Sequence, residues 1–272
     1  MVTGIFGVIV GPRLGGKTTL AATLPGSTLL LQAALLETGS RSAQALAKKR
    51  GSKLRVEAFN DLVHLRAWVD KVARGEVVAD HVYIDGLSAI TDMRFKQPDV
   101  QQAVKKNGYE GYRKLGEDVI DFILELKKIT EGANPKNVFV TVAGKIAQEK
   151  SNGPVDVVLE SKGNMAVTFI TKLGPTVLSV LSVQTEGGQK RVLITKDGVY
   201  EKWPGRIDGI LDEDNVGIME PDLAKVFALI DGIAAALAKG DEYVIRAYEK
   251  VEATGGTKRQ IFEQAMMDVQ ME

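Results

Sequence analysis

Short runs of apolar and β-branched residues alternate with longer amphipathic segments along the first 150 residues of the chain. The short runs have the composition of buried strands, and the longer segments carry apolar residues at the spacing of one helix face. The strand-like runs are residues 5–10, 27–32, 54–59, 81–85 and 138–143, and the helix-like segments are residues 18–24, 42–50, 62–72 and 115–129. This alternation predicts an α/β fold in which helices flank a mostly parallel central sheet.

The pattern changes beyond residue 154, where four short apolar runs are separated by Gly-Pro, Gly-Gly and Asp-Gly pairs. The runs are residues 155–159, 166–171, 177–184 and 190–195. Short strands joined by such turns predict β-hairpins, which would extend the parallel sheet with antiparallel strands.

Helix-like segments close the chain at residues 221–237, 243–253 and 258–269. A Gly255-Gly256 pair separates the last two. We expect one α/β core over residues 1–238 and a helical C-terminal extension over residues 239–272.

The first strand-like run leads into a glycine-rich sequence that fits a phosphate-binding loop. Residues 11–18 read G-P-R-L-G-G-K-T, a complete G-x-x-x-x-G-K-[ST] motif between a predicted strand and a predicted helix. Glycines let successive backbone N–H groups point at phosphate oxygens, and the lysine reaches the terminal phosphates. The predicted nucleotide contacts are Gly11, Pro12, Arg13, Leu14, Gly15, Gly16, Lys17, Thr18 and Thr19.

A second motif supplies the partner that such a loop requires. The apolar run at 81–85 ends in Asp85, about 70 residues after the loop, as a Walker B strand does. Asp85 and the Thr18 hydroxyl are oxygen ligands of the kind that Mg²⁺ prefers. The two motifs together predict a site for ATP and Mg²⁺, with Thr18 and Asp85 at the metal.

The composition excludes several other kinds of site. Lys plus Arg and Asp plus Glu both number 35, so the net charge of zero disfavours a strongly electrostatic partner such as non-specific duplex DNA. The chain has no cysteine and two histidines, which excludes disulfides and thiolate metal sites and disfavours a histidine metal centre. No apolar run approaches the ~20 residues of a membrane span, and we expect a cytoplasmic protein without a membrane partner.

With both motifs in place, the order of elements resembles the RecA-like P-loop ATPases. Among these the chain is similar to phage nucleotide-binding proteins, AAA-type ATPases associated with phage recombination and single-strand annealing. The resemblance is carried by 11–26, 84–88, 140–142, 198–206 and 220–223, and it spans about residues 4–235. It implies a RecA-like fold, ATP with Mg²⁺, a homo-oligomer, and action on DNA in the host cytoplasm.

The resemblance also indicates where catalytic residues belong, and here the chain departs from the family. The acidic residue usual after the second strand is missing, because that stretch reads Gln32-Ala33-Ala34, and Glu37 is the nearest substitute. Thr141 takes the position of the polar sensor, and Lys202 and Arg206 are candidates for the basic residue that reaches a neighbouring subunit's nucleotide. Together with Lys17 these form the expected catalytic set, which predicts a Mg²⁺-dependent ATPase of low turnover.

RecA-like recombinases, which the chain also resembles, hold single-stranded DNA partly through the segment after the Walker B strand. Here that segment, 94–114, is polar, interrupted by Pro98 and Gly108, and has four more cations than carboxylates. Aromatic side chains among the cations could stack on bases. The candidates are Arg94, Lys105, Lys106, Tyr109, Tyr112 and Arg113. A solvated loop explains the same composition, so a nucleotide-dependent switch or assembly factor without DNA binding is the alternative function.

Overall fold

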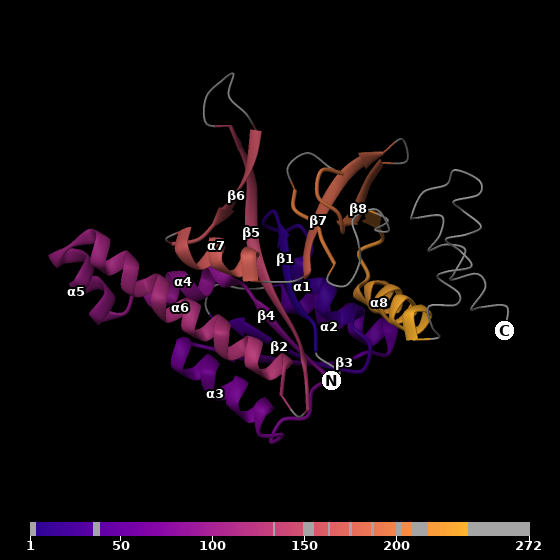
Figure 1. Ribbon diagram of the computed structural model, residues 1–272, viewed down its shortest axis with the longest axis horizontal. Helices are drawn as coiled ribbons and strands as arrows, with labels where there is room; N and C mark the ends of the chain where they lie inside the picture. The colour runs from indigo at the N-terminus through magenta and orange to yellow at the C-terminus, as the bar shows by residue number, and fades with distance from the viewer. Residues whose placement is uncertain are drawn as a thin grey trace.

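A single mixed sheet forms the centre of the protein in the computed structural model (Figure 1). The structure describes residues 4–34, 39–132, 134–148, 155–162, 164–173, 176–185, 188–199, 203–207 and 217–238. Within that part, nine strands follow the order β3-β2-β4-β5-β1-β7-β8-β9, and β6 pairs with β5. The strands are β1 Phe6–Gly11, β2 Ser27–Ala33, β3 Lys53–Phe59, β4 His81–Asp85, β5 Asn137–Gln148, β6 Val155–Glu160, β7 Thr176–Thr185, β8 Gly188–Ile194 and β9 Ile218–Met219.

Strand direction divides the sheet into two parts. The pairs β3–β2, β2–β4, β4–β5, β5–β1 and β1–β7 are all parallel, whereas β6, β8 and β9 join as antiparallel strands. The predicted α/β class is therefore confirmed, including the mostly parallel sheet, the flanking helices and the antiparallel extension. One detail differs, because β7 pairs with the parallel core through β1 as well as with its hairpin partner β8.

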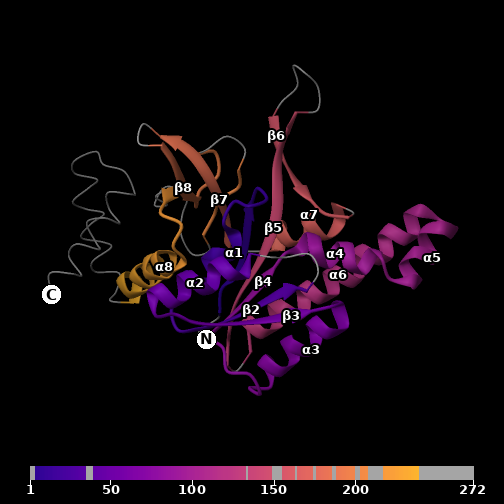
Figure 2. The same cartoon turned by 180° about the vertical axis from the view of Figure 1, so that it is seen from behind.

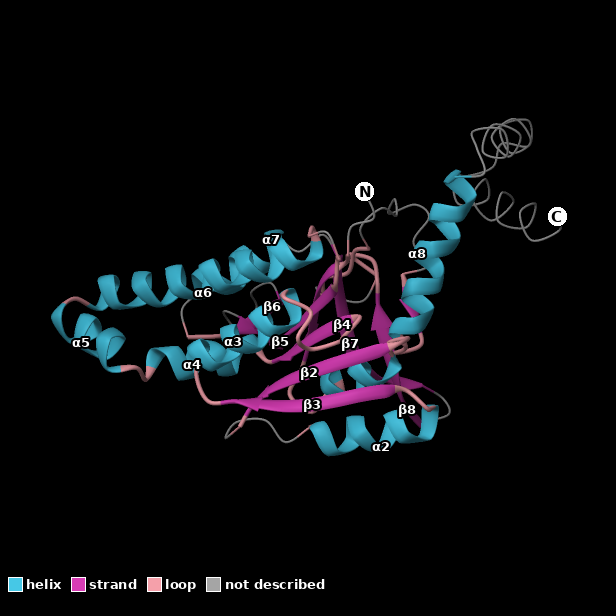
Figure 3. Ribbon diagram, turned by 90° about the horizontal axis from the view of Figure 1, so that it is seen from below, coloured by secondary structure: helices cyan, strands magenta, loops and turns pink. Residues whose placement is uncertain are grey.

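Helices cover both faces of the sheet, as the views from behind and below show (Figures 2 and 3). The core on one face includes residues of α1, α2 and α8, and the core on the other includes residues of α3, α4, α6 and α7. The helical elements are α1 Lys17–Leu20, the 3₁₀ turn η1 Ala21–Thr23, α2 Ser40–Arg50, α3 Leu62–Ala73, α4 Leu87–Phe95, α5 Pro98–Lys106, α6 Gly108–Thr130, α7 Asn164–Leu173 and α8 Leu223–Ala238. The α5–α6 pair projects beyond the sheet as an arm.

The arm corrects the sequence prediction for the polar stretch after Asp85. That stretch is helical, because Pro98 occupies the first turn of α5 and Asn107 caps α6 through a bond from the Tyr109 N–H. Proline is tolerated in the first turn of a helix, where its missing N–H has no partner to lose. Pro98 and Gly108 therefore mark helix starts, and α6 begins seven residues earlier than the predicted segment at 115.

The strand predicted at 166–171 is also wrong, because these residues lie in α7. Their β-branched composition favours a strand, but Ala166 and Ile170, four residues apart, are both buried in the core. Met165 extends to Gly116 of α6, where its Cε would lie 2.3 Å from an added Cβ. Packing of one helix face against α6 therefore overrides the local propensity.

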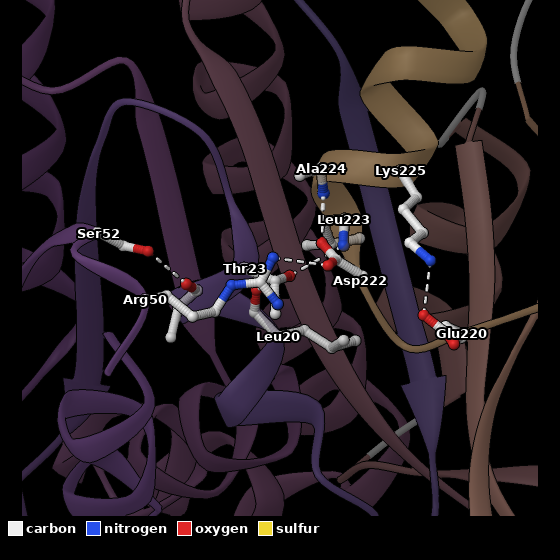
Figure 4. Close-up of polar contacts among 10 residues, drawn as sticks. Leu20, Thr23, Arg50, Ser52, Glu220, Asp222, Leu223, Ala224 and Lys225 are labelled. Carbon is white, nitrogen blue, oxygen red and sulfur yellow. Dashed lines mark hydrogen bonds and ion pairs between the residues drawn. The ribbon is translucent and has the colours of Figure 1, made fainter. Parts of the chain in front are cut away.

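Helix α8 is attached to the segment directly after the phosphate-binding loop (Figure 4). The buried Thr23 hydroxyl of η1 donates to the Leu20 carbonyl at 2.8 Å and accepts from the Leu223 N–H at 2.8 Å. Beside it, the Arg50 guanidinium of α2 pairs with Asp222 at 2.6 Å, and Asp222 also accepts from the Ala224 N–H. The first turn of α8 is thus held by both η1 and α2.

The predicted helices at 243–253 and 258–269, and with them the extension 239–272, lie outside the described residues. Within the part that the structure describes, no helix combines the length and apolar character needed to cross a membrane.

Candidate nucleotide site

The glycine-rich loop lies at the carboxyl end of β1, between the sheet and α1. The backbone at Gly16 has φ of 94°, which favours glycine, and an added Cβ at Gly11 would lie 2.5 Å from the Val180 carbonyl oxygen of β7. The Lys17 ammonium donates to the carbonyls of Gly11 and Pro12 at 3.0 and 2.8 Å. The lysine therefore lies folded over its own loop, at the end of β1.

Asp85 connects this loop to the two neighbouring strands. Its carboxylate, 2% exposed at the end of β4, accepts from the Thr18 hydroxyl at 2.6 Å and from the Thr141 hydroxyl of β5 at 2.8 Å. Three side chains predicted from sequence for the site thus meet in one hydrogen-bonded group. The group forms because β5 lies between β4 and β1, so all three strands end at the same edge of the sheet.

Tyr83 of β4 connects the sheet to the start of α1. Its hydroxyl, two residues before Asp85 on β4, donates to the Lys17 carbonyl at 2.5 Å. Burial raises the pKa of Tyr83 well above its usual range, so the phenol stays a neutral donor. The start of α1 is therefore held by a donor whose protonation state does not change near neutral pH.

A cavity of about 660 Å³ opens above the loop. This volume lies within the ~300–1,000 Å³ that small-molecule sites commonly have. Its lining includes residues 13–19 of the loop, the Asp85 and Thr141 side chains, and Ser88, Ala89 and Asp92 from one face of α4. Gly39 also lines the cavity, and an added Cβ there would approach the Thr18 hydroxyl oxygen to 2.6 Å.

These residues fit the chemistry of a nucleotide with Mg²⁺. Backbone N–H groups of the loop and the Lys17 ammonium suit phosphate oxygens, while the Asp85 carboxylate and Thr18 hydroxyl are hard oxygen ligands. Among the described residues no cluster of three or more His, Cys, Asp or Glu side chains could hold a metal by itself. Mg²⁺ in proteins is commonly held by one or two side-chain oxygens together with substrate phosphates and water, which fits the Asp85 and Thr18 pair.

The other sequence-predicted catalytic residues divide into two groups. Glu37 and Lys202 lie outside the described residues. Arg206 is described, and its guanidinium donates to the Thr171 carbonyl of α7 while its backbone forms a bridge to Val177. Arg206 is absent from the cavity lining, so the structure does not bring it to the loop of its own chain.

Two charged residues of the cavity were missed by sequence reasoning. Asp92 of α4 lines it one helical turn beyond Ser88, and Arg191 of β8 lines it from the opposite side of β1. Asp92 could have been found from its spacing on the helix face that follows Asp85. Arg191 is 175 residues from Gly16 in sequence and gives no local signal.

Several predicted DNA contacts have partners inside the chain. Arg94 pairs with Asp99 and with Asp118, both at 2.6 Å, and Arg113 pairs with Glu110 and Glu117. Hydrogen bonds from Arg94 and then Lys114 hold the pKa of Asp99 well below its usual range. Tyr112 stacks on Phe95. In contrast, Lys105, Lys106 and Tyr109 are exposed near the tip of the arm, with Tyr109 74% accessible.

No model of a known protein family matches the sequence, and no curated protein matches it. Among solved structures, the chain is similar to a KaiC-like protein from the hyperthermophilic archaeon Pyrococcus horikoshii. The likeness covers 71% of this chain and 78% of that protein, with 17% sequence identity and a TM-score of 0.39.

Proposed function

We propose that this protein is a RecA-like P-loop ATPase that binds ATP with Mg²⁺ in the cavity above residues 11–19. The observation that carries the proposal is the Thr18–Asp85–Thr141 group at the base of that cavity, with hydroxyl–carboxylate distances of 2.6 and 2.8 Å. A glycine-rich loop alone occurs in other contexts, but here its Thr hydroxyl faces the carboxylate of a second strand. That pairing is what a phosphate-bound Mg²⁺ requires.

Each residue of the proposed site has a distinct role. The loop N–H groups hold the phosphates, and Lys17 leaves its two carbonyl partners to contact the terminal phosphates. Thr18 and Asp85 hold Mg²⁺, which when bound neutralises charge that develops on the phosphates. Thr141 orients Asp85 by donating to its second oxygen. Either Glu37, from the sequence, or Asp92, from the cavity lining, would orient the attacking water.

ATP binding is tested by calorimetric titration of Lys17→Ala against Lys49→Ala, which removes an equal charge from the exposed face of α2. We expect the Lys17 variant to lose ATP affinity by at least about tenfold, because a charge-assisted contact is worth ~1.5–3 kcal/mol. The Lys49 variant should bind like the wild type. A Lys17→Ala protein with wild-type ATP affinity would refute the site.

We further propose that the protein is a homo-oligomer that binds single-stranded DNA in phage-type recombination, repair or annealing. Support comes from the arm, whose tip presents Lys105, Lys106 and Tyr109 without an ion pair or ring contact among the described residues. Lysines contact the backbone of single strands, and an exposed aromatic ring can stack on a base. Arg94 and Arg113 would contribute to the stability of the arm instead.

The DNA proposal is tested by fluorescence anisotropy of labelled single-stranded DNA, with and without ATP and Mg²⁺. Replacing Lys105 and Lys106 with alanine should reduce the slope of log affinity against log salt by about 1.4, which is ~0.7 per lost phosphate contact. The matched control replaces Lys48 and Lys49, which are likewise exposed and lie in the last turn of α2 as Lys105 and Lys106 lie in the last turn of α5. Absence of binding at low salt in both nucleotide conditions would contradict DNA binding.

That negative result would favour the second candidate, a nucleotide-dependent switch or assembly factor with slow hydrolysis and no DNA contact. The specific observation in its favour is that Arg94, Arg113 and Tyr112 already have intramolecular partners. Loss of ATP binding in Lys17→Ala together with absent DNA binding would identify this function.

A further inference from the structure

Arg191 places a guanidinium directly against the phosphate-binding loop. A Cβ added to Gly16 would lie 3.0 Å from Nη1, 3.1 Å from Cζ and 3.2 Å from Nε of Arg191. All three distances are shorter than ordinary van der Waals contact, so the planar group lies beside Gly16 where a side chain would otherwise project. The space that the missing glycine side chain leaves is occupied by a cation.

Strand geometry explains how Arg191 reaches this position. Side chains two residues apart on a strand point to the same face of the sheet. Leu193 belongs to the buried core that includes Leu20 of α1, whereas Val192 belongs to the core on the opposite face. Arg191 therefore points to the face that carries the loop, and its neighbour Lys190 points to the other.

The electrostatic setting leaves Arg191 available to a ligand. It lines the cavity, is exposed, and forms no ion pair with any carboxylate in the part of the chain that the structure describes. By contrast, Arg13 of the same cavity pairs with Glu160 at 3.0 Å. A guanidinium beside a ring of backbone N–H groups favours an anion with several oxygens, because its donors form a fixed fork.

The position of Arg191 in the sheet indicates which part of the nucleotide it would contact. Asp85 and Thr141, which mark the Mg²⁺ and terminal phosphate end, are on β4 and β5. Arg191 is on β8, and β1 with its loop lies between β5 and β7. Because the loop backbone at Gly16 contacts the inner phosphates, a group resting on Gly16 is nearest to the α- and β-phosphates.

We propose that Arg191 is a phosphate-binding residue supplied by the same chain, which contacts the α- and β-phosphates of the bound nucleotide. The inference rests on the proposed nucleotide site. It adds that Arg191 contributes to the affinity for the diphosphate as well as for the triphosphate. It differs from a basic residue that acts only on the terminal phosphate, since that group would distinguish ATP from ADP.

The test is calorimetric titration of ADP·Mg²⁺ and of a non-hydrolysable ATP analogue into wild type, Arg191→Ala, Arg191→Lys and Lys190→Ala. We expect Arg191→Ala to reduce the affinity for both nucleotides by about tenfold. This is the lower end of the range for a hydrogen bond to a charged group, because Arg191 is exposed. Arg191→Lys should recover part of the loss, and Lys190→Ala should match the wild type. The difference between wild type and Arg191→Ala should shrink as salt rises.

Three results would overturn the assignment. These are unchanged affinity for both nucleotides in Arg191→Ala, a loss confined to the ATP analogue, and an equal loss in Lys190→Ala. A wild-type protein that binds neither nucleotide would instead refute the proposed nucleotide site. Melting curves without nucleotide should be alike for all variants, because the Arg191 side chain is exposed.

Discussion

Replacing Thr23 with valine should detach the first turn of α8 from the segment that follows the phosphate-binding loop. Thr23 is 4% exposed, and its hydroxyl accepts from the Leu223 N–H at 2.8 Å across 200 residues of sequence. Valine has nearly the same shape but cannot accept a hydrogen bond. The substitution therefore leaves a buried N–H without this partner.

The size of the effect follows from what remains at the site. An unsatisfied buried donor such as the Leu223 N–H costs about 1–3 kcal/mol. The Leu20 carbonyl also loses its bond from the Thr23 hydroxyl, but it lies within a helical turn, so we assign the cost to the N–H. The Arg50–Asp222 pair, partly exposed, still holds the turn and should contribute under about 1 kcal/mol. We expect α8 to be destabilised by about 1–2 kcal/mol relative to the sheet, which corresponds to about tenfold faster amide exchange.

Native-state hydrogen exchange measures this change directly. Amides of α8 near Leu223 and Val226 should exchange faster in Thr23→Val, while those of β1 and β4 should be unaffected. Thr23→Ser keeps the hydroxyl and should restore protection. Thr130→Val is the matched control, because Thr130 is also buried but its hydroxyl only donates to Lys127 within α6. Equal exchange of α8 in the two valine variants would refute the reasoning.

Two further predictions concern protonation and catalysis. Burial lowers the pKa of His81 from its usual value. The neutral ring fits the network, since Nδ1 faces the Asn137 amide at 3.1 Å and Nε2 faces the Pro25 carbonyl. The unfolded state therefore binds more protons than the folded state, so the urea midpoint should decrease as the pH is lowered from 7 to 5. His81→Gln should make the midpoint less dependent on pH over this range. Asp92→Asn should reduce ATP turnover by about 100-fold or more, as loss of a general base does, with nucleotide affinity within about twofold. Unchanged turnover would leave Glu37 as the residue to test.

The sequence predicts the parts of this fold that are encoded locally. The apolar run 81–85 and the loop 11–18 identify β4, β1 and the start of α1, because each combines a strand pattern with residues that its chemistry requires. The pair Asn60-Asp61 likewise predicts a helix start at 62, and Asp61 caps α3 by accepting from the His64 N–H. These features depend on neighbours within a few residues, so reading the chain in order is enough to find them.

Other features depend on contacts between distant segments and could not be predicted in this way. The strand-like composition of 166–171 becomes a helix because Ala166 and Ile170 pack in the core beside α6. The contact of Arg191 with Gly16 exists because β7 and β8 are added beside β1. In each case the sequence contains the residues, but only the topology brings them together.

If nucleotide binds at the proposed site, the two hydrogen bonds that hold the α1–η1 segment would couple its binding to α8. With four α-helical residues and one 3₁₀ turn, the α1–η1 segment is too short to be stable alone, so its order depends on tertiary contacts. Tyr83 of the sheet donates to the carbonyl of its first residue, Lys17. The hydroxyl of its last residue, Thr23, accepts from the Leu223 N–H of α8. Phosphate bound by the loop, as proposed, would stabilise the same segment. Because linkage is reciprocal, nucleotide bound at the proposed site would protect α8 by the free energy through which α8 orders the loop. A variant that loosens α8 at Thr23 would weaken nucleotide binding by the same amount.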